Sequence, residues 1–410
     1  MTTQANVDLV PASGLSFRSL VLPRLSGIAE GVLTLREGGA SSIHGTPTAD
    51  GLAAEVVVRH PAFWRRVATG GTLGAAESYA AGEWDTPDLT AVVRLMARNV
   101  SAMDGLEGGL ALLRRPVDAI RHALRRNTRS GSRRNITEHY DLGDEFFELM
   151  LDPTMTYSCG IFERPESTLE EASLAKIDRL CRLLRLGPDD HLLEIGTGWG
   201  ALAVHAASRY GCRVTTTTIS RNQLARARQR VADAGLSDRV TVLHSDYRDL
   251  QGRFDKVVSV EMLEAVGADY YGTFFGKCAS LLEDDGLLAL QVITIADARY
   301  EQHVHGVDFI KRYVFPGSNI PSITALLGAA TRHSDLTLRH LDDIGPHYAT
   351  TLAAWRANLA RNADAVSRLT DERFRRIWHF YLCYCEAGFA ERYLGDAQML
   401  LSRPRGMVSP

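Results

Sequence analysis

The stretch "LLEIGTGWG" combines an acidic residue with three closely spaced glycines. Glu194 precedes Gly196, Gly198 and Gly200 in an E-x-G-x-G-x-G pattern, between a β-rich run and a helical one. Glycines suit a sharp turn where a ligand meets the backbone without a Cβ in the way. An acid here would repel a pyrophosphate, but it can hold a cationic amino-acid group through backbone and water. The pattern therefore favours S-adenosylmethionine (SAM), and methyl transfer, over a nicotinamide or flavin cofactor.

Polar residues after the next two β-rich runs are candidates to complete a SAM site. The second run ends in "TTTTISRNQ", without the acid that often holds the ribose hydroxyls, so Thr218, Ile219 and Gln223 would serve there. After the third run, "HSDYRDL" supplies Asp246 and Tyr247 for the adenine. Asp246 has a second interpretation as a helix N-cap, which is common after a strand.

A second stretch, "PTMTYSCGIF", places Tyr157, Ser158 and Cys159 together about thirty residues upstream of the glycine loop. It has too few turn residues for an ordinary loop and too little alternation for a good strand. Taken alone, Cys159 is most simply a small buried side chain. Its position before the glycine loop makes it a candidate site residue as well.

These residues need a scaffold, and the chain from about residue 170 supplies an α/β pattern. "HLLEI", "RVTTTTI", "RVTVLH", "DKVVSV" and "GLLALQVI" are short β-rich runs separated by helical segments such as "EASLAKIDRLCRLLRL". Such alternation predicts an α/β fold with a mostly parallel sheet and right-handed crossovers. After about residue 350 the chain is helical and aromatic ("FRRIWHFYLCYCEAGFAERYL"), which fits either packing against the sheet or a wall of an apolar pocket.

Three regions of the chain differ in composition and sequence pattern, and these differences predict the domain organisation. Residues 1–110 mix short β-type runs with small-residue helices and predict a small α+β module. Residues 111–134 form a basic helix and linker, with eight arginines and one acid between Arg114 and Arg134, a local charge of +7. This segment is either a solvated helix or a patch for anionic phosphates. The absence of interleaved aromatic residues argues against single-stranded nucleic acid. We expect residues 135–410, which contain the glycine loop, to be the catalytic domain.

Composition sets outer limits on the function. The chain has 410 residues, 45% hydrophobic content and a formal net charge of −3, which is ordinary for a globular protein. It shows no secretory signal and no apolar run long enough to span a bilayer, so we expect a cytoplasmic protein. Its six cysteines are scattered without C-x-x-C spacing, so we expect reduced thiols and no metal site.

The ordered motifs resemble one family, the cyclopropane-fatty-acyl-phospholipid synthases and their mycolic-acid cyclopropane-synthase relatives. The resemblance covers nearly all of residues 135–400. The earlier "ESYAAGEWD" resembles the amino-terminal module of the longer phospholipid-acting members. The motifs that carry it are "NITEHYDLGDEFF", "LDPTMTYSCGIF", "LLEIGTGWG", "TTTTISRNQ", "SDYRDL", "FDKVVSVEMLEAVG", "IKRYVFPGSNIPS" and "GPHYATTLAAW".

The resemblance implies a SAM-methyltransferase fold with a seven-stranded sheet and a role for each matching residue. Tyr140, Tyr157 and Ser158 would close over the amino-acid end of SAM. A small cage would hold a bicarbonate ion beside the reacting carbon. Its members would be Cys159, Glu264, Ile293 through its backbone, Tyr348 and, where the family has histidine, Gln291. A second family histidine falls on Ala265.

The implied reaction methylates a cis double bond in an unsaturated acyl chain of a membrane phospholipid. The resulting carbocation needs a dry, apolar, aromatic-lined pocket, and a base must then remove a proton from the new methyl group. Loss of that proton with ring closure gives a cyclopropane, which is the expected product. Because Gln291 cannot carry a proton as imidazole does, a methylene- or methyl-branched chain is the alternative.

The resemblance also implies partners and a location. We expect docking on anionic phospholipid at the inner face of the membrane, through the amino-terminal module and Arg114–Arg134, and a homodimer built on that module. Two other classes of function remain open. One is a methyltransferase for a small soluble nucleophile, for which Glu261 is the available base. The other is a non-enzymatic lipid- or nucleic-acid-binding protein on a vestigial SAM fold.

Overall fold

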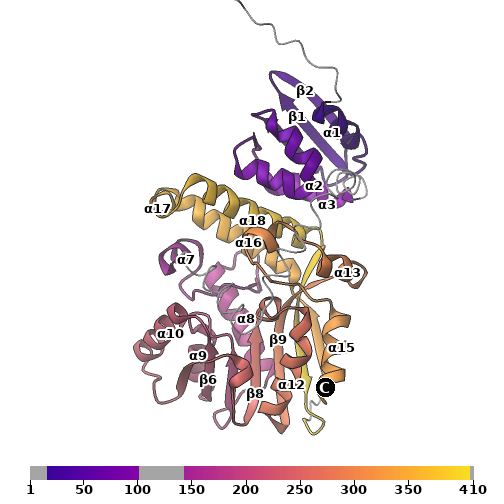
Figure 1. Ribbon diagram of the computed structural model, residues 1–410. Coiled ribbons are helices and arrows are strands. Elements are labelled where there is room, and N and C mark those ends of the chain that lie inside the picture. Colours follow the sequence, from indigo (N-terminus) through magenta and orange to yellow (C-terminus); the bar gives the residue numbers. More distant parts are fainter. Residues whose placement is uncertain (1–15, 101–142, 407–410) are drawn as a thin grey trace, which may run out of the picture.

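The computed structural model describes residues 16–100 and 143–406 of the chain. Within these ranges the protein has a large part built on a seven-stranded sheet and a smaller N-terminal part built on a four-stranded sheet (Figure 1). Tyr140 and the basic segment Arg114–Arg134, which the sequence analysis singled out, lie outside the described residues.

The larger sheet has the strand order β10-β11-β9-β8-β5-β6-β7. Strands β5 to β9 pair in parallel, whereas β11 is antiparallel to both β9 and β10. The predicted α/β fold with a mostly parallel seven-stranded sheet is therefore confirmed, although β11 lies in the tail that the sequence analysis described as helical. The strands are β5 (His191–Ile195), β6 (Arg213–Thr218), β7 (Val240–His244), β8 (Phe254–Val260), β9 (Leu282–Ile295), β10 (Thr337–Asp343) and β11 (Leu394–Ser402).

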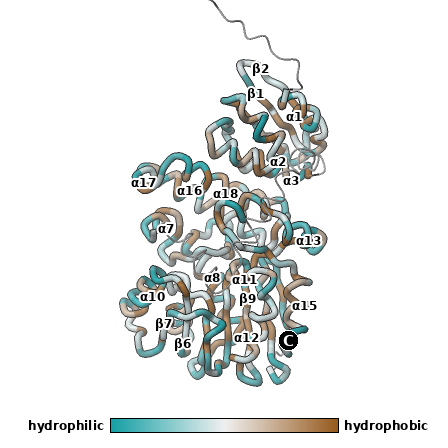
Figure 2. Tube along the Cα trace, in the orientation of Figure 1, coloured by the Kyte–Doolittle hydropathy of each residue, from teal (hydrophilic) through white to brown (hydrophobic). Residues whose placement is uncertain are grey.

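Helices and short turns connect these strands and cover the sheet. Buried apolar side chains lie on both of its faces, which is why the central strands are nearly continuous in hydrophobic residues. Figure 2 shows the contrast between the hydrophobic β9 and α15 and the hydrophilic outer helix α10. The connecting elements are α8 (Leu169–Leu183), α9 (Ala201–His205), η2 (Ala206–Tyr210), α10 (Arg221–Asp233), η3 (Tyr247–Asp249), α11 (Leu263–Val266), η4 (Ala268–Tyr270), α12 (Tyr271–Leu281), α13 (Asp297–His305), α14 (Phe309–Tyr313) and α15 (Ile323–His333).

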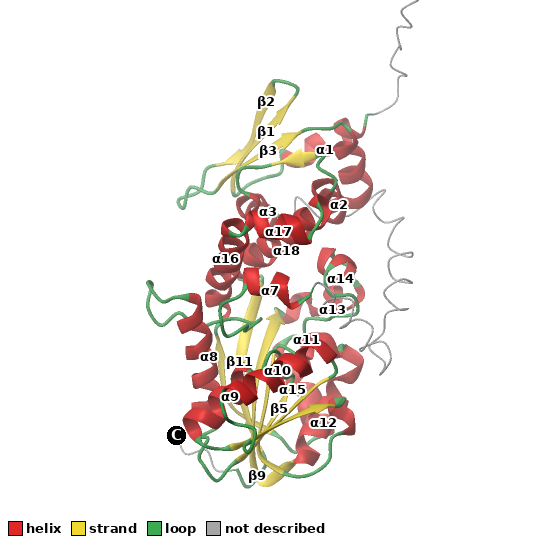
Figure 3. Ribbon diagram, turned by 90° about the vertical axis from the view of Figure 1, so that its left-hand side faces the viewer, coloured by secondary structure: helices red, strands yellow, loops and turns green. Residues whose placement is uncertain are grey.

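A helical layer separates the large sheet from the N-terminal part (Figures 1 and 3). It consists of α16 (Gly345–Arg361), α17 (Ala363–Leu369) and α18 (Glu372–Ala390), with α7 (Asp144–Met150) beside it. Its aromatic side chains pack in one hydrophobic cluster that also includes residues of the N-terminal part. No helix among the described residues is long and apolar enough to cross a membrane.

The N-terminal part is a four-stranded sheet of order β2-β1-β3-β4 packed on helices. Leu33 and Leu35 alternate inward along β1, as expected for a strand with one buried face. Gly71, with φ of 55°, kinks the long helix α2, a conformation that favours glycine. The elements are α1 (Phe17–Leu25), β1 (Gly31–Glu37), β2 (Ala40–Thr46), β3 (Ala53–Val58), α2 (Ala62–Ala80), β4 (Trp84–Asp85) and α3 (Leu89–Arg98).

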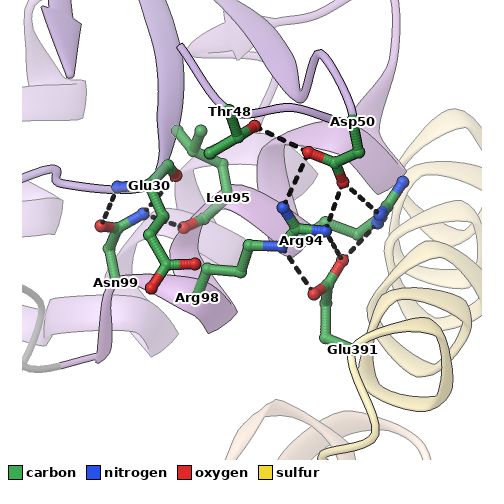
Figure 4. Close-up of polar contacts among 8 residues, drawn as sticks. All are labelled: Glu30, Thr48, Asp50, Arg94, Leu95, Arg98, Asn99 and Glu391. Carbon is green, nitrogen blue, oxygen red and sulfur yellow. Dashed lines mark hydrogen bonds and ion pairs between the residues drawn. The ribbon is translucent and has the colours of Figure 1, made fainter. Parts of the chain in front are cut away.

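An ion cluster joins the two parts at the end of α18 (Figure 4). The Glu391 carboxylate accepts hydrogen bonds from Arg94 Nε at 2.6 Å and from Arg98 Nε at 2.7 Å, both on α3. Arg98 also donates to both carboxylate oxygens of Asp50, at 2.6 and 3.1 Å. Because the Glu391 side chain is only 11% exposed, its charge depends on these arginines for hydrogen bonds.

We expect Glu391→Ala to lower the free energy of unfolding by about 1–3 kcal/mol, since it leaves two partly buried guanidinium groups with only the more exposed Asp50 as a carboxylate partner. Urea unfolding of the purified chain would measure the change. The matched control is Glu166→Ala, which removes an exposed partner of Arg164 and should cost less than about 0.5 kcal/mol. Equal effects of the two substitutions would show that the cluster does not hold the two parts together.

Candidate active site

A large cavity of about 890 Å³ lies at the carboxyl ends of the parallel strands and extends to α18 and α3. Ligands of open α/β sheets bind at this edge. Most of the residues predicted from the sequence line it. These are Tyr157, Ser158, Glu194, Gly196, Gly198, Thr218, Ile219, Gln223, Asp246, Tyr247, Glu264, Ile293 and Tyr348. Gly200, Cys159 and Gln291 do not line the cavity, and Tyr140 falls outside the described residues.

The glycine loop turns sharply after β5, as its sequence predicts. Gly196 and Gly198 have φ of 102° and 52°, so both adopt backbone conformations that side chains disfavour. Gly200 also has a positive φ, of 88°, and it has a second reason to be glycine, because a Cβ there would lie 3.2 Å from the Cβ of Ala227 on α10. Gly200 therefore permits close packing of α10, while Gly196 and Gly198 expose backbone to the cavity.

Glu194 ends β5 with its carboxyl group almost fully buried. Thr216 donates a hydrogen bond of 2.6 Å to Glu194 Oε2. Burial raises the pKa of Glu194 to about 8, while this hydrogen bond and Lys176 act in the opposite direction. A cationic ligand group at the cavity would favour the ionised carboxylate, as expected for the amino group of SAM.

The residues after β6 and β7 are tied to one another. Thr218 Oγ1 donates a hydrogen bond of 2.8 Å to Gln223 Oε1. The amide nitrogen of Gln223 takes no part in this bond. Arg248 binds both carboxylate oxygens of Asp246, at 2.8 and 2.6 Å, and its backbone N–H caps onto Oδ1 at 3.0 Å. Asp246 therefore combines both interpretations given to it, since it is an N-cap and also lines the cavity.

Tyr157 and Ser158 contact residues from distant elements. The Tyr157 and Tyr381 hydroxyl groups lie 2.8 Å apart, which joins this loop to α18. Lys176 Nζ donates to Ser158 Oγ at 2.8 Å from a side chain that is 2% exposed. Burial lowers the pKa of Lys176, whereas the carboxylates around it, of which Glu261 is the strongest, favour its charged form.

The Glu261 carboxylate is the centre of the hydrogen bonds in the inner part of the cavity. Its Oε1 accepts from the backbone N–H of Cys159 and from Gln291 Nε2, each at 2.8 Å. Its Oε2 accepts from the Tyr348 hydroxyl group at 2.6 Å. Three groups that the sequence analysis assigned to a bicarbonate cage therefore bind a side chain of the protein itself.

Glu264 lies one helical turn further on and has a different environment. Its Oε1 accepts from the backbone N–H of Ile293 at 2.5 Å, so two residues that were expected to bind bicarbonate bind each other. Its Oε2 is buried and has no hydrogen-bond partner among the described residues. Burial and the charge of Glu261 raise the pKa of Glu264 to about 8, so this carboxyl group is neutral at pH 7.

Asp396 of β11 lies behind Glu261 and is fully buried. Gln291 Nε2 donates to Asp396 Oδ2 at 3.0 Å as well as to Glu261, so the amide nitrogen bridges two carboxyl groups. Burial and the charge of Glu261 raise the pKa of Asp396 well above its ordinary value. Burial also raises the pKa of Glu261, but its three hydrogen-bond donors act in the opposite direction. Because Glu261 receives three donors and Asp396 only this one, we place the proton of the pair on Asp396 and the charge on Glu261.

These contacts do not fit a bound bicarbonate ion. The donors that the family resemblance assigns to the anion are used by Glu261 and Glu264, and Cys159 and Gln291 are withdrawn from the cavity. A second anion would also lie against the negative charge of Glu261. Burial and Asp396 raise the pKa of the Cys159 thiol well above its ordinary value, so it is not a thiolate nucleophile either.

Sequence reasoning missed Lys176, Thr216 and Asp396, and it gave Glu261 a role only in a small-molecule enzyme. The sequence does contain a signal for Lys176. It lies at helical spacing between Ala172 and Leu180, which places it on the buried face of α8. Asp396 had the weakest signal, since it meets Glu261 only when β11 pairs with β9.

Comparisons with known proteins identify the family of the chain. The sequence matches the family described as "Mycolic acid cyclopropane synthetase" over residues 127–399. It is 39% identical to "Tuberculostearic acid methyltransferase UfaA1" of Mycobacterium tuberculosis over 367 residues, covering 87% of this chain and 85% of that protein. It is 35% identical to "Cyclopropane-fatty-acyl-phospholipid synthase" of Escherichia coli over 352 residues, covering 85% and 88%.

Solved structures give the same picture. The fold matches mycolic acid cyclopropane synthase CmaA1, crystallised with SAH and CTAB, with a TM-score of 0.62 and 34% identity, over 66% of this chain and 98% of that one. The cyclopropane synthase MmaA2 from Mycobacterium tuberculosis matches with the same TM-score and 32% identity, again over 66% and 98%. Coclaurine N-methyltransferase, at 19% identity and a TM-score of 0.61, shares the fold.

The raised pKa of Glu264 predicts how stability depends on pH. The folded state holds a proton on Glu264 up to about pH 8, whereas an unfolded glutamate loses it near pH 4.3, so this group's contribution to stability falls as the pH rises between these values. We expect Glu264→Gln to raise the melting temperature relative to the wild type by several degrees more at pH 8.5 than at pH 5.5, at about 2–4 °C per kcal/mol. Glu301→Gln, at an exposed position, is the control and should show no such difference. A pH-independent effect of Glu264→Gln would mean that Glu264 is ionised throughout.

Proposed function

The chain belongs to the mycolic acid cyclopropane synthetase family and is a SAM-dependent methyltransferase, and we propose that it methylates a cis double bond in an unsaturated acyl chain of a membrane phospholipid. The observation that carries this proposal is the cavity itself. It joins a polar end, at the glycine loop, to a long apolar end that reaches the N-terminal part. Such a shape suits a polar methyl donor and a hydrocarbon acceptor that meet in the middle.

The middle of the cavity is suited to a carbocation. Phe389 of α18 stacks on Tyr348, with ring centroids 4.4 Å apart, and Tyr381 and Tyr384 line the same wall. Aromatic faces attract positive charge, and an enclosed site keeps water from trapping the cation. These side chains support an alkene as the methyl acceptor, because an alkene becomes cationic when it attacks the methyl group.

The helix α3 supplies an apolar wall at the far end of the cavity. One stripe of α3, with Leu89, Val92 and Leu95, is buried in the core of the N-terminal part. A second stripe, with Val93, Met96 and Ala97, lines the cavity at i, i+3 and i+4 spacing, which places its members on one side of the helix. Val100, just beyond the end of α3, also lines the cavity. A helix with two apolar faces needs two apolar partners, and an acyl chain serves as the second.

The chemistry can be written from SAM and the alkene alone. The alkene carbon forms a bond to the SAM methyl group, the carbon–sulfur bond breaks, and S-adenosylhomocysteine is left with a cation on the neighbouring carbon of the chain. Loss of a proton from the new methyl group with ring closure gives a cyclopropane. If a hydride shifts first to the cationic carbon, loss of a proton from the same methyl group gives a methylene branch.

We propose the methylene branch as the product, because the position next to the catalytic carboxylates carries an amide. Gln291 bridges Glu261 and Asp396, and its amide cannot take up a proton near neutral pH as an imidazole can. Slower removal of the proton lengthens the life of the cation and gives the hydride shift time to occur. The higher identity to the tuberculostearic acid methyltransferase supports this choice. A cyclopropane is the second candidate, supported by the family match and by the Escherichia coli synthase.

Access to phospholipid requires contact with a membrane surface. We propose that the protein acts as a peripheral enzyme, as a homodimer built on its N-terminal part, at the inner face of the membrane. The charge of +7 over Arg114–Arg134 supports an anionic surface as the partner.

Incubation with deuteromethyl SAM and vesicles of unsaturated phosphatidylglycerol tests the reaction and the product together. We expect the acyl chain to gain a CD2 group, since one deuteron is lost from the transferred CD3. NMR of the isolated lipid should show an exocyclic methylene carbon and no cyclopropane carbons. Saturated vesicles are the control and should gain no label. Transfer to a small soluble acceptor, without transfer to any unsaturated lipid, would contradict the proposal.

Substitution of Ala97 tests the acyl wall. A phenylalanine at position 97 shortens the apolar end of the cavity, so we expect kcat/KM for an acyl chain with a long methyl-side segment to fall about tenfold, which corresponds to about 1.4 kcal/mol. A chain shortened only on the methyl side of its double bond should be affected much less. Ala81→Phe introduces the same side chain at an exposed position of the N-terminal part and should change neither rate. Equal losses for both chain lengths would mean that Ala97 does not contact the substrate.

A further inference from the structure

We propose that Glu261 takes the place of an external bicarbonate ion, so that its own carboxylate is the base that removes the proton from the transferred methyl group. This inference rests on the proposed reaction with an alkene. It assigns to this chain a base that is part of the protein, and it predicts that the enzyme works without any bound anion.

The first argument is the convergence of donors on Glu261. A backbone N–H from the loop at Cys159, an amide nitrogen from β9 and a phenol from α16 point to one carboxylate, at 2.6 to 2.8 Å. Three donors from three separate elements form a site for an oxyanion with planar oxygens. Glu261 fills this site and also lines the cavity, so its carboxylate is both fixed and accessible to a ligand.

The backbone at Glu261 provides an independent observation. Its φ is 45°, in the left-handed region that disfavours residues other than glycine. Its backbone N–H donates to the carbonyl oxygen of Gln291 at 2.7 Å, which holds the turn in place. Strain of this kind costs about 1–3 kcal/mol and persists where the surrounding structure fixes it. Here it directs a glutamate side chain toward the cage, where a glycine would leave the cage empty.

The electrostatic arrangement keeps the base ionised. Asp396 and Glu264 are the neighbouring carboxyl groups and both hold protons, so Glu261 carries the negative charge of the cluster. Burial raises the pKa of Glu261, whereas its hydrogen bonds from Tyr348, Cys159 and Gln291 and the nearby Lys176 favour the ionised form. A carboxylate with three hydrogen bonds is a weak base. A weak base is sufficient, because a C–H bond beside a carbocation is strongly acidic.

The proton-transfer step balances without another reactant. The C–H bond of the transferred methyl group breaks, its electron pair closes the ring or forms the methylene double bond, and the proton moves to the Glu261 carboxylate. The positive charge on the chain and the negative charge on Glu261 are both removed. When the products leave and water enters, Glu261 returns the proton to the solvent.

The decisive variant is Glu261→Gly, because glycine accepts the φ of 45° and leaves the three donors in place for an added anion. In buffer freed of carbon dioxide we expect wild-type activity to be unchanged and the variant to lose at least about a hundredfold in kcat. Addition of bicarbonate or formate should restore activity to the variant and leave the wild type unaffected. Loss of wild-type activity on removal of bicarbonate, or full activity of the variant without any anion, would overturn the proposal.

Two further measurements separate this result from failure to fold and from failure of the proposed reaction. Glu261→Gln keeps the shape of the side chain, so it should fold, lose activity and resist rescue because the amide still occupies the cage. Arg185→Gly is the control for backbone strain. Arg185 has a similar positive φ of 53° but does not line the cavity, so glycine relieves the same kind of strain away from the site. Binding of ¹³C-bicarbonate, followed by NMR line broadening without substrate, should occur with Glu261→Gly and not with the wild type. If the wild type binds bicarbonate, the assignment of Glu261 is wrong even if the lipid reaction is right.

Discussion

The interior of this protein is organised around one buried carboxylate that needs partners. A charged group withdrawn from water is costly unless it is hydrogen-bonded, and Glu261 obtains its bonds from the loop at Cys159, from β9 and from α16. These three segments are far apart in the chain, so their meeting at one carboxylate helps to fix the helical layer over the sheet. The small side chain of Cys159 follows from the same constraint, because a backbone N–H must come close to the carboxylate in a region with no free space.

The two ends of the cavity are built by different parts of the fold and suit different ligands. The parallel strands end in turns and polar side chains, which suits the recognition of a small polar donor. The helical layer and α3 add aromatic and aliphatic side chains, which recognise only shape and lack of charge. The mycolic acid synthase structures match over 66% of this chain, so the N-terminal part is an addition to the shared fold. Its contribution to the cavity wall shows that it forms part of the same chamber.

The sequence predicted those elements that are determined by residues close together in the chain. The β-rich runs around "HLLEIGTGWG" appear as strands, and the three glycines adopt the left-handed conformations expected of a tight loop. It could not identify which glutamate of "EMLEAVG" accepts the converging donors, because those donors come from segments about 30 to 100 residues away. The motif resemblance favoured Glu264, and the structure shows that Glu264 binds only the backbone of Ile293 in this group. Lys176 and Asp396 were missed for the same reason, since burial of a polar residue depends on tertiary packing.

The position of β11 has a consequence for how the protein is made. This strand follows all the others in the chain, yet it lies between β9 and β10 and carries Asp396 to the inner end of the chamber. During synthesis β9 and β10 are therefore complete while the place between them is still vacant, and each presents an unpaired edge. The place between β9 and β10 can be filled only after β11 has been synthesised. Completion of the chamber is thus linked to β11 by topology, and an intermediate without β11 exposes two strand edges that favour aggregation.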